Sequence, residues 1–185
     1  MGHRLSKIYT RTGDKGETGL GDGTRINKDS LRVETFGTVD ELNSIIGMIL
    51  AHELPQTIRK CLENVQHDLF DLGGEFSIPG YKTLRDSDVS RLEARLDELN
   101  ADLPPLKEFI LPAGGHATSH CHLARTVCRR AERRATTLAK KENINPAAMA
   151  YLNRLSDLLF VIARVLARVE NGEEVLWNRK EARDK

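Results

Sequence analysis

Apolar residues recur at spacings of three and four in five segments of this sequence, at about 39–52, 55–72, 88–100, 116–141 and 147–170. Such spacing places apolar side chains on one face of an α-helix. The links between the segments are short, so the pattern predicts an all-α fold, a five-helix bundle. A length of 185 residues fits a single domain over residues 1–185.

Local signals predict where these helices begin and end. Thr38 with Glu41 has the spacing of a capping box, which predicts that the first helix begins near residue 39. Pro55 and Pro146 suit the first turns of the second and fifth helices. The Gly73-Gly74 pair is expected to weaken the second helix, and residues 172–185 are expected to form a flexible tail.

Composition restricts the class of protein. Aromatic residues make up only 5% of the chain and charged residues 30%, which favours a helical bundle over a β-sandwich. The net charge of +1 argues against a generally basic nucleic-acid binder. RNA binding through a local basic block remains an alternative, although the scarcity of aromatic residues for base stacking argues against it.

Cysteine usage and hydropathy indicate the compartment. Cys61, Cys121 and Cys128 are odd in number and lie in helical segments, so we expect reduced core thiols in a cytoplasmic protein. No apolar run approaches the length that a bilayer requires, so no association with a membrane is expected.

Basic residues concentrate in the fourth helical segment. Arg125, Arg129 and Arg133 lie at i, i+4 and i+8 and form a stripe on one face, with Glu132 beside it. Stacked guanidinium groups repel one another unless solvent or an anion intervenes, and their geometry suits phosphate oxygens. The stripe is therefore either a solvated helix face or an anion site.

The fifth helical segment carries Asn153 and Asp157 on a face that also includes Ser156 and Phe160. Polar side chains one turn apart would be costly in a core without partners. The simpler interpretation is that Asn153 and Asp157 pair with a solvent-exposed arginine stripe.

Residues 7–30 lack helical periodicity and are rich in glycine. Residues 10–19 combine glycines, hydroxyls and cations, and glycines allow backbone amides to approach phosphate oxygens. The segment is nevertheless neither a Walker A sequence nor a dinucleotide-binding fingerprint. By general rules, residues 1–30 are a weak candidate for a nucleotide-binding loop.

Four motifs together resemble the PduO-type ATP:cob(I)alamin adenosyltransferases. They are residues 7–16 (KIYTRTGDKG), 37–43 (GTVDELN), 109–112 (FILP) with 124–133 (ARTVCRRAER), and 151–157 (YLNRLSD). The resemblance implies transfer of the 5′-deoxyadenosyl group of ATP to the cobalt of cob(I)alamin. It also implies a homotrimer with active sites between subunits. Ala113 is a departure, since many relatives are expected to have glycine there.

The resemblance also implies residue roles. Arg125, Arg129, Asp40 and Phe109 would be catalytic, with Asp40 paired to Arg125 across subunits and Phe109 binding the corrinoid beneath its ring. Mg²⁺ would accompany ATP. A corrinoid reductase or an adenosylcobalamin-dependent enzyme would be a further partner. The implied ATP-binding residues are Thr10, Arg11, Thr12, Gly13, Thr18, Gly19, Lys28, Arg129, Arg130, Glu132, Arg133 and Asn153.

Two other interpretations compete with this one. His116 and His120 share a helix face near Cys121 and His122, which suggests a zinc site, although the last two residues point elsewhere on the helix. The chain could instead be a bundle that binds ATP as a sensor without chemistry. Such a sensor would yield no adenosylated product from ATP and cob(I)alamin.

Overall fold

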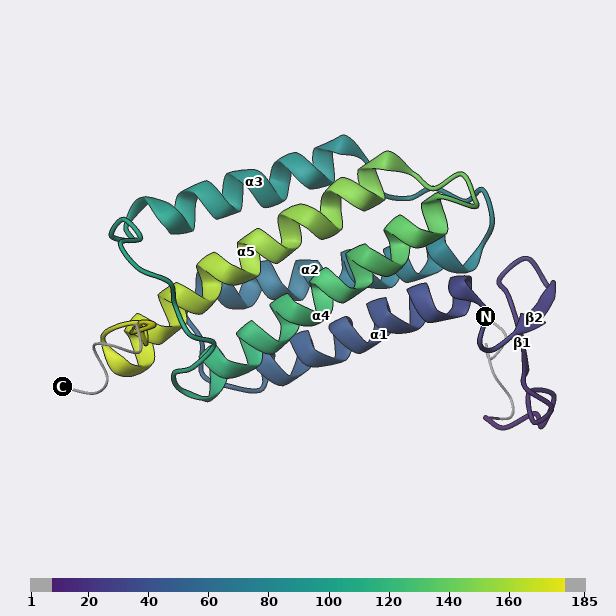
Figure 1. The fold of residues 1–185 in the computed structure, drawn as a ribbon, viewed down its shortest axis with the longest axis horizontal. Coiled ribbons are helices and arrows are strands. Elements are labelled where there is room, and N and C mark those ends of the chain that lie inside the picture. Colours follow the sequence, from purple (N-terminus) through teal and green to yellow (C-terminus); the bar gives the residue numbers. More distant parts are fainter. Residues whose placement is uncertain (1–7, 179–185) are drawn as a thin grey trace.

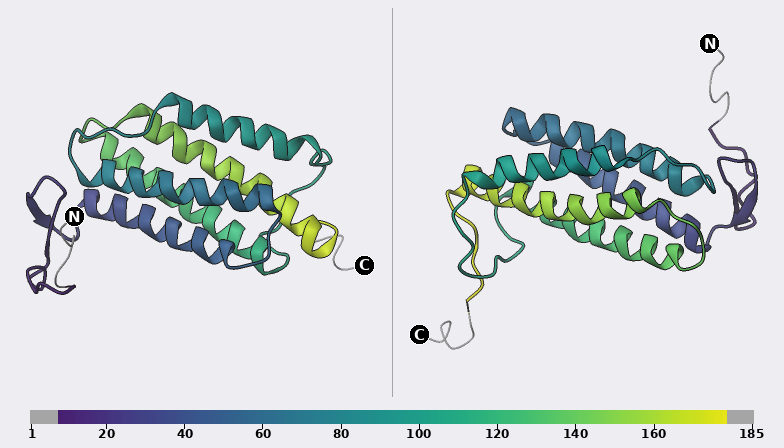
Figure 2. Two further views of the ribbon diagram at one scale, coloured as in Figure 1. Left: turned by 180° about the vertical axis from the view of Figure 1, so that it is seen from behind. Right: turned by 90° about the horizontal axis from the view of Figure 1, so that it is seen from above.

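The computed structural model describes residues 8–178, which form five helices and one small antiparallel sheet. The helices lie side by side in an elongated bundle, and the sheet lies beyond the end at which α1 begins (Figures 1 and 2). Residues 1–7 of the expected nucleotide-binding loop and residues 179–185 of the expected tail lie outside the described residues. The elements are β1 Glu17–Gly19, β2 Arg25–Asn27, α1 Leu31–Leu50, α2 Gln56–Ser77, α3 Asp86–Ala101, α4 His116–Ala139 and α5 Pro146–Asn171.

Helix α4 lies at the centre of the bundle, packed against both α1 and α5, while α2 packs on α1 and α3 on α5. Small residues on its buried face allow this close packing: Ala117, Cys121, Ala124, Cys128, Ala131 and Ala135. Two of them bond to α5, since the thiols of Cys121 and Cys128 donate to the carbonyls of Leu159 and Leu152, each at 3.2 Å. Cys61 is also buried and free, as predicted for reduced core thiols.

Two helix boundaries differ from the prediction. Helix α1 begins at Leu31, and the N-cap is Ser30, whose hydroxyl accepts a bond from the Val33 amide. Thr38 lies inside the helix and donates to the Glu34 carbonyl at 2.7 Å. The predicted start at residue 39 was therefore wrong, because both hydroxyls fit the N-cap preference and local sequence does not choose between them.

Helix α2 continues through the Gly73-Gly74 pair to Ser77, past the point where it was expected to weaken. The last turn is held by burial of Phe76 and Glu75. The Glu75 carboxylate accepts bonds from the backbone amides of Thr83 and Leu84, at 2.7 and 3.0 Å. Tertiary contacts thus outweigh the low helix propensity of glycine.

The expected N-terminal loop contains a short β-hairpin. Strands β1 and β2 pair with Glu17 opposite Asn27 and Gly19 opposite Arg25. The connecting turn is closed by a bond from the Leu20 amide to the Thr24 carbonyl at 2.8 Å, and it uses Gly23 at φ 87°. Within residues 8–178, no helix is both long enough and apolar enough to cross a membrane.

Candidate active site

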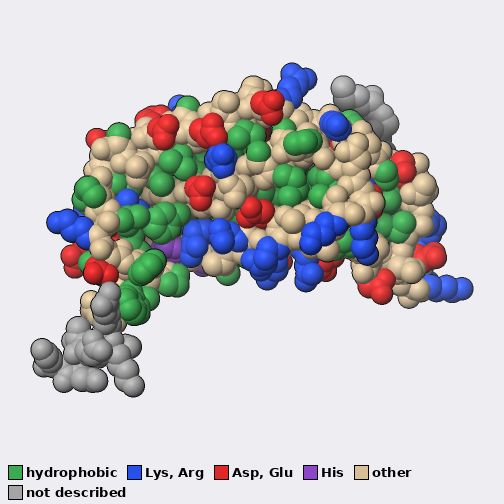
Figure 3. All heavy atoms as spheres, turned by 45° about the horizontal axis from the view of Figure 1, so that its top comes forward, with side chains coloured by type: hydrophobic (Ala, Val, Ile, Leu, Met, Phe, Trp, Pro, Cys, Tyr) green, Lys and Arg blue, Asp and Glu red, His purple; other side chains and the backbone are tan. Residues whose placement is uncertain are grey.

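The arginine stripe lies on α4 as predicted. Arg125 is half-buried, whereas Arg129 and Arg133 are exposed and form no ion pair among residues 8–178. Figure 3 shows a row of Lys and Arg side chains along one side of the molecule. Two free guanidinium groups one turn apart form a surface that attracts a polyanion.

The arginines next to the stripe are engaged within the chain. Arg130 forms an ion pair with Glu41 of α1, and Arg134 pairs with Glu34 at 3.2 Å. These pairs connect α4 to α1. Arg130 was expected to contact ATP, and in this chain its guanidinium already contacts a carboxylate.

Asn153 of α5 bonds to Glu132, the acidic residue beside the stripe on α4. Its amide donates to Glu132 at 2.9 Å, and its carbonyl accepts from Arg154 at 2.6 Å. The simpler interpretation had Asn153 and Asp157 pairing with the arginines. In the described residues Asn153 bonds Glu132 and Arg154, and Asp157 is exposed without an ion pair.

The N-terminal residues expected to bind ATP form a second group. The hydroxyls of Thr10 and Thr12 are 2.8 Å apart, and Arg25 donates to the Thr12 carbonyl at 2.7 Å. Arg11 between them has a positive φ of 61°. Thr18 and Gly19 lie in β1.

Gly13 is where the chain approaches the Lys28 ammonium. A Cβ at Gly13 would lie 3.1 Å from Lys28 Nζ and 3.2 Å from the Glu17 carbonyl oxygen. A side chain there would displace the cation. Lys28, just after β2, also lines a groove of about 570 Å³ with Arg130 and Arg134, between α1 and α4. Residues 10–13, Arg129 and Arg133 do not line this groove.

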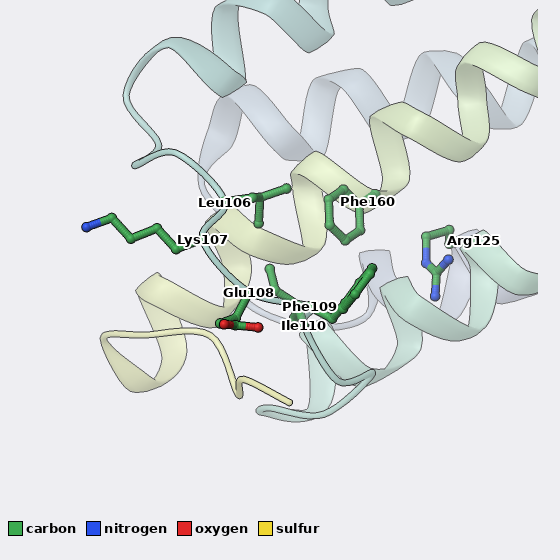
Figure 4. A pocket seen from close by; sticks show the side chains of 7 residues that line it. All are labelled: Leu106, Lys107, Glu108, Phe109, Ile110, Arg125 and Phe160. Carbon is green, nitrogen blue, oxygen red and sulfur yellow. The ribbon is translucent and has the colours of Figure 1, made fainter. Parts of the chain in front are cut away.

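Phe109 and Arg125 line a cleft of about 450 Å³, whose other walls are mainly the apolar side chains of Leu106, Ile110 and Phe160. In Figure 4 Phe109, Phe160 and Arg125 surround the same opening, whereas Lys107 extends away from it. The Phe109 side chain is unusually open to solvent, at 78% exposed. An exposed aromatic ring beside an apolar cleft is typical of a ligand-binding surface.

The environment of Arg125 favours an additional anionic partner. Burial, together with repulsion from Arg129, lowers the pKa of its guanidinium. Its Nε is buried and has no hydrogen-bond partner among the described residues. A charged group left in this state is costly unless a partner satisfies it.

Asp40 and Arg125 line different grooves of this chain. It is exposed on α1 and lines a groove of about 500 Å³ with Gly37, Phe70 and Gly73. Among residues 8–178, Asp40 forms no ion pair. An Asp40–Arg125 pair would therefore require a second copy of the chain.

His116 and His120, which were suspected of binding zinc, lie against His52 and do not form a cluster with Cys121. His120 Nδ1 lies 3.0 Å from Nε2 of His52, and His116 stacks on His52 with ring centroids 6.1 Å apart. Cys121 and His122 point into the bundle and are buried. Among residues 8–178, no three His, Cys, Asp or Glu side chains are arranged to hold a metal ion.

Two features of the site were not predicted as such. Phe160 lines the cleft and is an aromatic residue on the polar face of α5. An aromatic residue on a polar helix face is the sequence signal that could have identified it. His122 is 3% exposed, and its Nδ1 has no partner among the described residues. Burial, with a further contribution from Arg125, lowers the pKa of His122 to about 4.

We expect His122 to make the fold acid-sensitive. Its folded pKa of about 4 lies below the ordinary 6.5, so the unfolded chain binds the proton first as pH falls. The loss of folding stability caused by His122 is absent above about pH 6.5 and grows as the pH falls from 6.5 to 4. At pH 5 it reaches roughly 2 kcal/mol. Urea unfolding of wild type and His122→Leu at pH 7.5 and 5 measures it.

His122→Leu should lose less stability than wild type between pH 7.5 and pH 5. His67→Leu is the control, since His67 is exposed on α2. An equal pH dependence for wild type and His122→Leu would contradict the role of His122.

Comparison with known proteins identifies the family. A cobalamin adenosyltransferase family profile matches residues 8–166. A cobalamin adenosyltransferase of Cupriavidus metallidurans is 57% identical over 181 residues, covering 97% of this chain and 98% of that protein. A corrinoid adenosyltransferase of Bacillus subtilis is 51% identical over 168 residues, covering 86% of each chain.

A solved structure agrees with these sequence matches. It is of a variant PduO-type ATP:corrinoid adenosyltransferase from Lactobacillus reuteri, complexed with cobalamin and ATP. It superposes with a TM-score of 0.89 at 35% identity, covering 94% of this chain and 100% of that one. The chain described here therefore belongs to the cobalamin adenosyltransferase family.

Proposed function

We propose that this protein transfers the 5′-deoxyadenosyl group of ATP to the cobalt of cob(I)alamin, releasing triphosphate and forming adenosylcobalamin. The observation that carries the proposal is the position of Arg125. It begins the arginine stripe and also lines the apolar cleft beside Phe109. One side chain thus belongs both to a stripe that would hold a polyanion and to an apolar cleft that would receive one face of a corrin.

The protein's part in this reaction is positioning and charge stabilisation. A cobalt–carbon bond forms at C5′ while the C5′–O bond breaks, and its electron pair leaves with the triphosphate. Cob(I)alamin is itself a strong nucleophile, so the protein need supply none. Arg129, Arg133 and Lys28 would hold the leaving triphosphate, with Mg²⁺ accompanying ATP.

Phe109 would act on the corrinoid. A bulky apolar ring against one face of the corrin would exclude a lower axial ligand, which raises the reduction potential of cob(II)alamin. The exposure of Phe109 and the apolar walls beside it support this role.

The active site would lie between subunits of a homotrimer. Asp40 is exposed and Arg125 is half-buried, and neither forms an ion pair among residues 8–178, so a contact between copies would pair the two charges. The same contact would allow residues 10–13 of one subunit to approach Arg129 of the next. Phe70, 71% exposed beside Asp40, supplies apolar area for such an interface.

We expect Asp40→Asn to lower turnover about tenfold by removing a partly buried ion pair at this interface. Sedimentation measures assembly, and steady-state rates measure turnover. Asp97→Asn is the control, because Asp97 is an exposed carboxylate on α3. Equal rates and assembly for the two single variants would contradict the ion pair.

The reaction itself is tested by mixing the protein with ATP, Mg²⁺ and chemically reduced cobalamin. The expected result is a light-sensitive cobalt–carbon product and one triphosphate per product. Binding of ATP without any such product would identify a nucleotide sensor and contradict the proposal. RNA binding that weakens steeply with salt would instead favour an RNA-binding function.

We further propose that the enzyme works in the cytoplasm, next to a corrinoid reductase or an adenosylcobalamin-dependent enzyme. Three buried free thiols support a reducing compartment. Co-purification of adenosylation activity with the soluble cell fraction is the expected outcome.

A further inference from the structure

The segment after α5 pairs with the loop that carries Phe109. Residues 173–177, here called the C-terminal strap, run antiparallel to residues 109–111. The Leu111 amide donates to the Val175 carbonyl at 2.9 Å, and the Trp177 amide donates to the Phe109 carbonyl at 2.7 Å. The right-hand view of Figure 2 shows the yellow segment running beside the teal loop between α3 and α4. The expectation of a flexible tail from residue 172 does not account for this pairing.

The strap is anchored to the bundle through Glu174. Gly172, at φ 82°, ends α5 and turns the chain back. The Glu174 carboxylate, 7% exposed, accepts from Arg164 at 3.0 Å and pairs with Arg168 at 2.9 Å. Burial alone would raise the pKa of Glu174, but its hydrogen bonds outweigh burial and keep the pKa below its ordinary value.

Arg164 also bonds to the loop between α3 and α4, the segment that pairs with the strap. Its second guanidinium nitrogen donates to the Pro104 carbonyl at 2.6 Å, near the start of the loop that leads to Phe109. One buried arginine thus fixes both the strap and the loop to α5. Arg164 therefore holds the strap at Glu174 and the loop at Pro104, and these two residues lie beyond opposite ends of the backbone pairing.

The strap ends against the ring of Phe109. The ring of Trp177 meets it edge-on, with centroids 6.3 Å apart and planes at 79°. This is a favourable arrangement for two aromatic rings. Because Phe109 is 78% exposed, little else limits its rotation.

We propose that the C-terminal strap positions Phe109, and that Trp177 holds its ring in the orientation needed against the corrin. This rests on the proposed function, in which Phe109 excludes the lower axial ligand. Trp177 is a positioning residue, acting through Phe109 on the corrinoid step alone. The residues expected to contact ATP, among them Thr10, Lys28 and Arg129, do not line the cleft at Phe109.

The test compares Trp177→Ala with wild type, with Trp177→Phe as the conservative variant. The bound cob(II)alamin that has lost its lower ligand is measured by electron paramagnetic resonance. We expect Trp177→Ala to lower that fraction about three- to tenfold, the range that one aromatic pair supports. Trp177→Phe should restore most of it, and KM for ATP should not change.

Tyr81→Ala is the matched control, because Tyr81 is a half-exposed aromatic residue remote from the cleft. An unchanged ligand-free fraction in Trp177→Ala would overturn the proposal. So would a parallel loss of ATP affinity and thermal stability, which would show a merely structural role. If wild type forms no adenosylcobalamin, the proposed function fails instead, a result separate from any difference between variants.

Trp177 also offers a readout that does not depend on activity. It is the chain's single tryptophan, so its fluorescence reports on the strap alone. Without corrinoid, Phe109→Ala should shift the emission of Trp177, whereas Tyr81→Ala should not. Identical emission spectra for wild type and Phe109→Ala would contradict the contact.

Discussion

Replacing Arg129 with alanine is expected to lower kcat about a hundredfold while the fold stays intact. Removing one charge-assisted contact to a developing negative charge costs about 3 kcal/mol of transition-state stabilisation. Arg129 is exposed and forms no ion pair among residues 8–178, so its loss breaks no contact that holds the described bundle together. Rates with chemically reduced cobalamin, together with far-UV circular dichroism, measure both halves of the prediction.

The control for this experiment is Arg95→Ala. Arg95 lies on α3 and pairs with Glu98 at 2.6 Å on the surface, so its loss removes the same charge away from the stripe. It should leave kcat within about twofold. A near-normal rate for Arg129→Ala would show that the arginine stripe is not part of the active site.

Replacing Phe109 with alanine is expected to slow adenosylation that starts from cob(II)alamin by about tenfold or more. The reason is that an open lower face lets an axial ligand return, which lowers the reduction potential. With chemically reduced cob(I)alamin the loss should be smaller, and KM for ATP should be unchanged. Turnover from the two cobalt oxidation states, with Tyr81→Ala as the control, measures the difference. Equal losses from both states, accompanied by weaker ATP binding, would contradict the role of Phe109.

The helices were predictable because each contains enough periodic apolar residues to define one face. The long, strongly periodic α5 was expected over 147–170 and is found at Pro146–Asn171. The start of α1 was not predictable, because Ser30 and Thr38 are both acceptable caps. The three-residue strands β1 and β2 are too short to show alternation, so the hairpin had no periodic signal.

The parts of the site that lie on one helix were also predictable. Arg125, Arg129 and Arg133 share a face of α4 because their spacing matches the helical repeat. Pairings between segments that are distant in the sequence were not predictable. Nothing local indicates that Trp177 meets Phe109 or that Arg164 joins Glu174 to Pro104. Contacts between copies of the chain, such as Asp40 with Arg125, remain a prediction.

The most direct test of the account is a crystal structure of the wild-type protein with ATP and Mg²⁺. The triphosphate is expected between Arg129 and Arg133 of one subunit and residues 10–13 with Lys28 of another, with C5′ directed toward the cleft at Phe109. Arginines of α4 pointing into bulk solvent, with the nucleotide bound elsewhere, would contradict it.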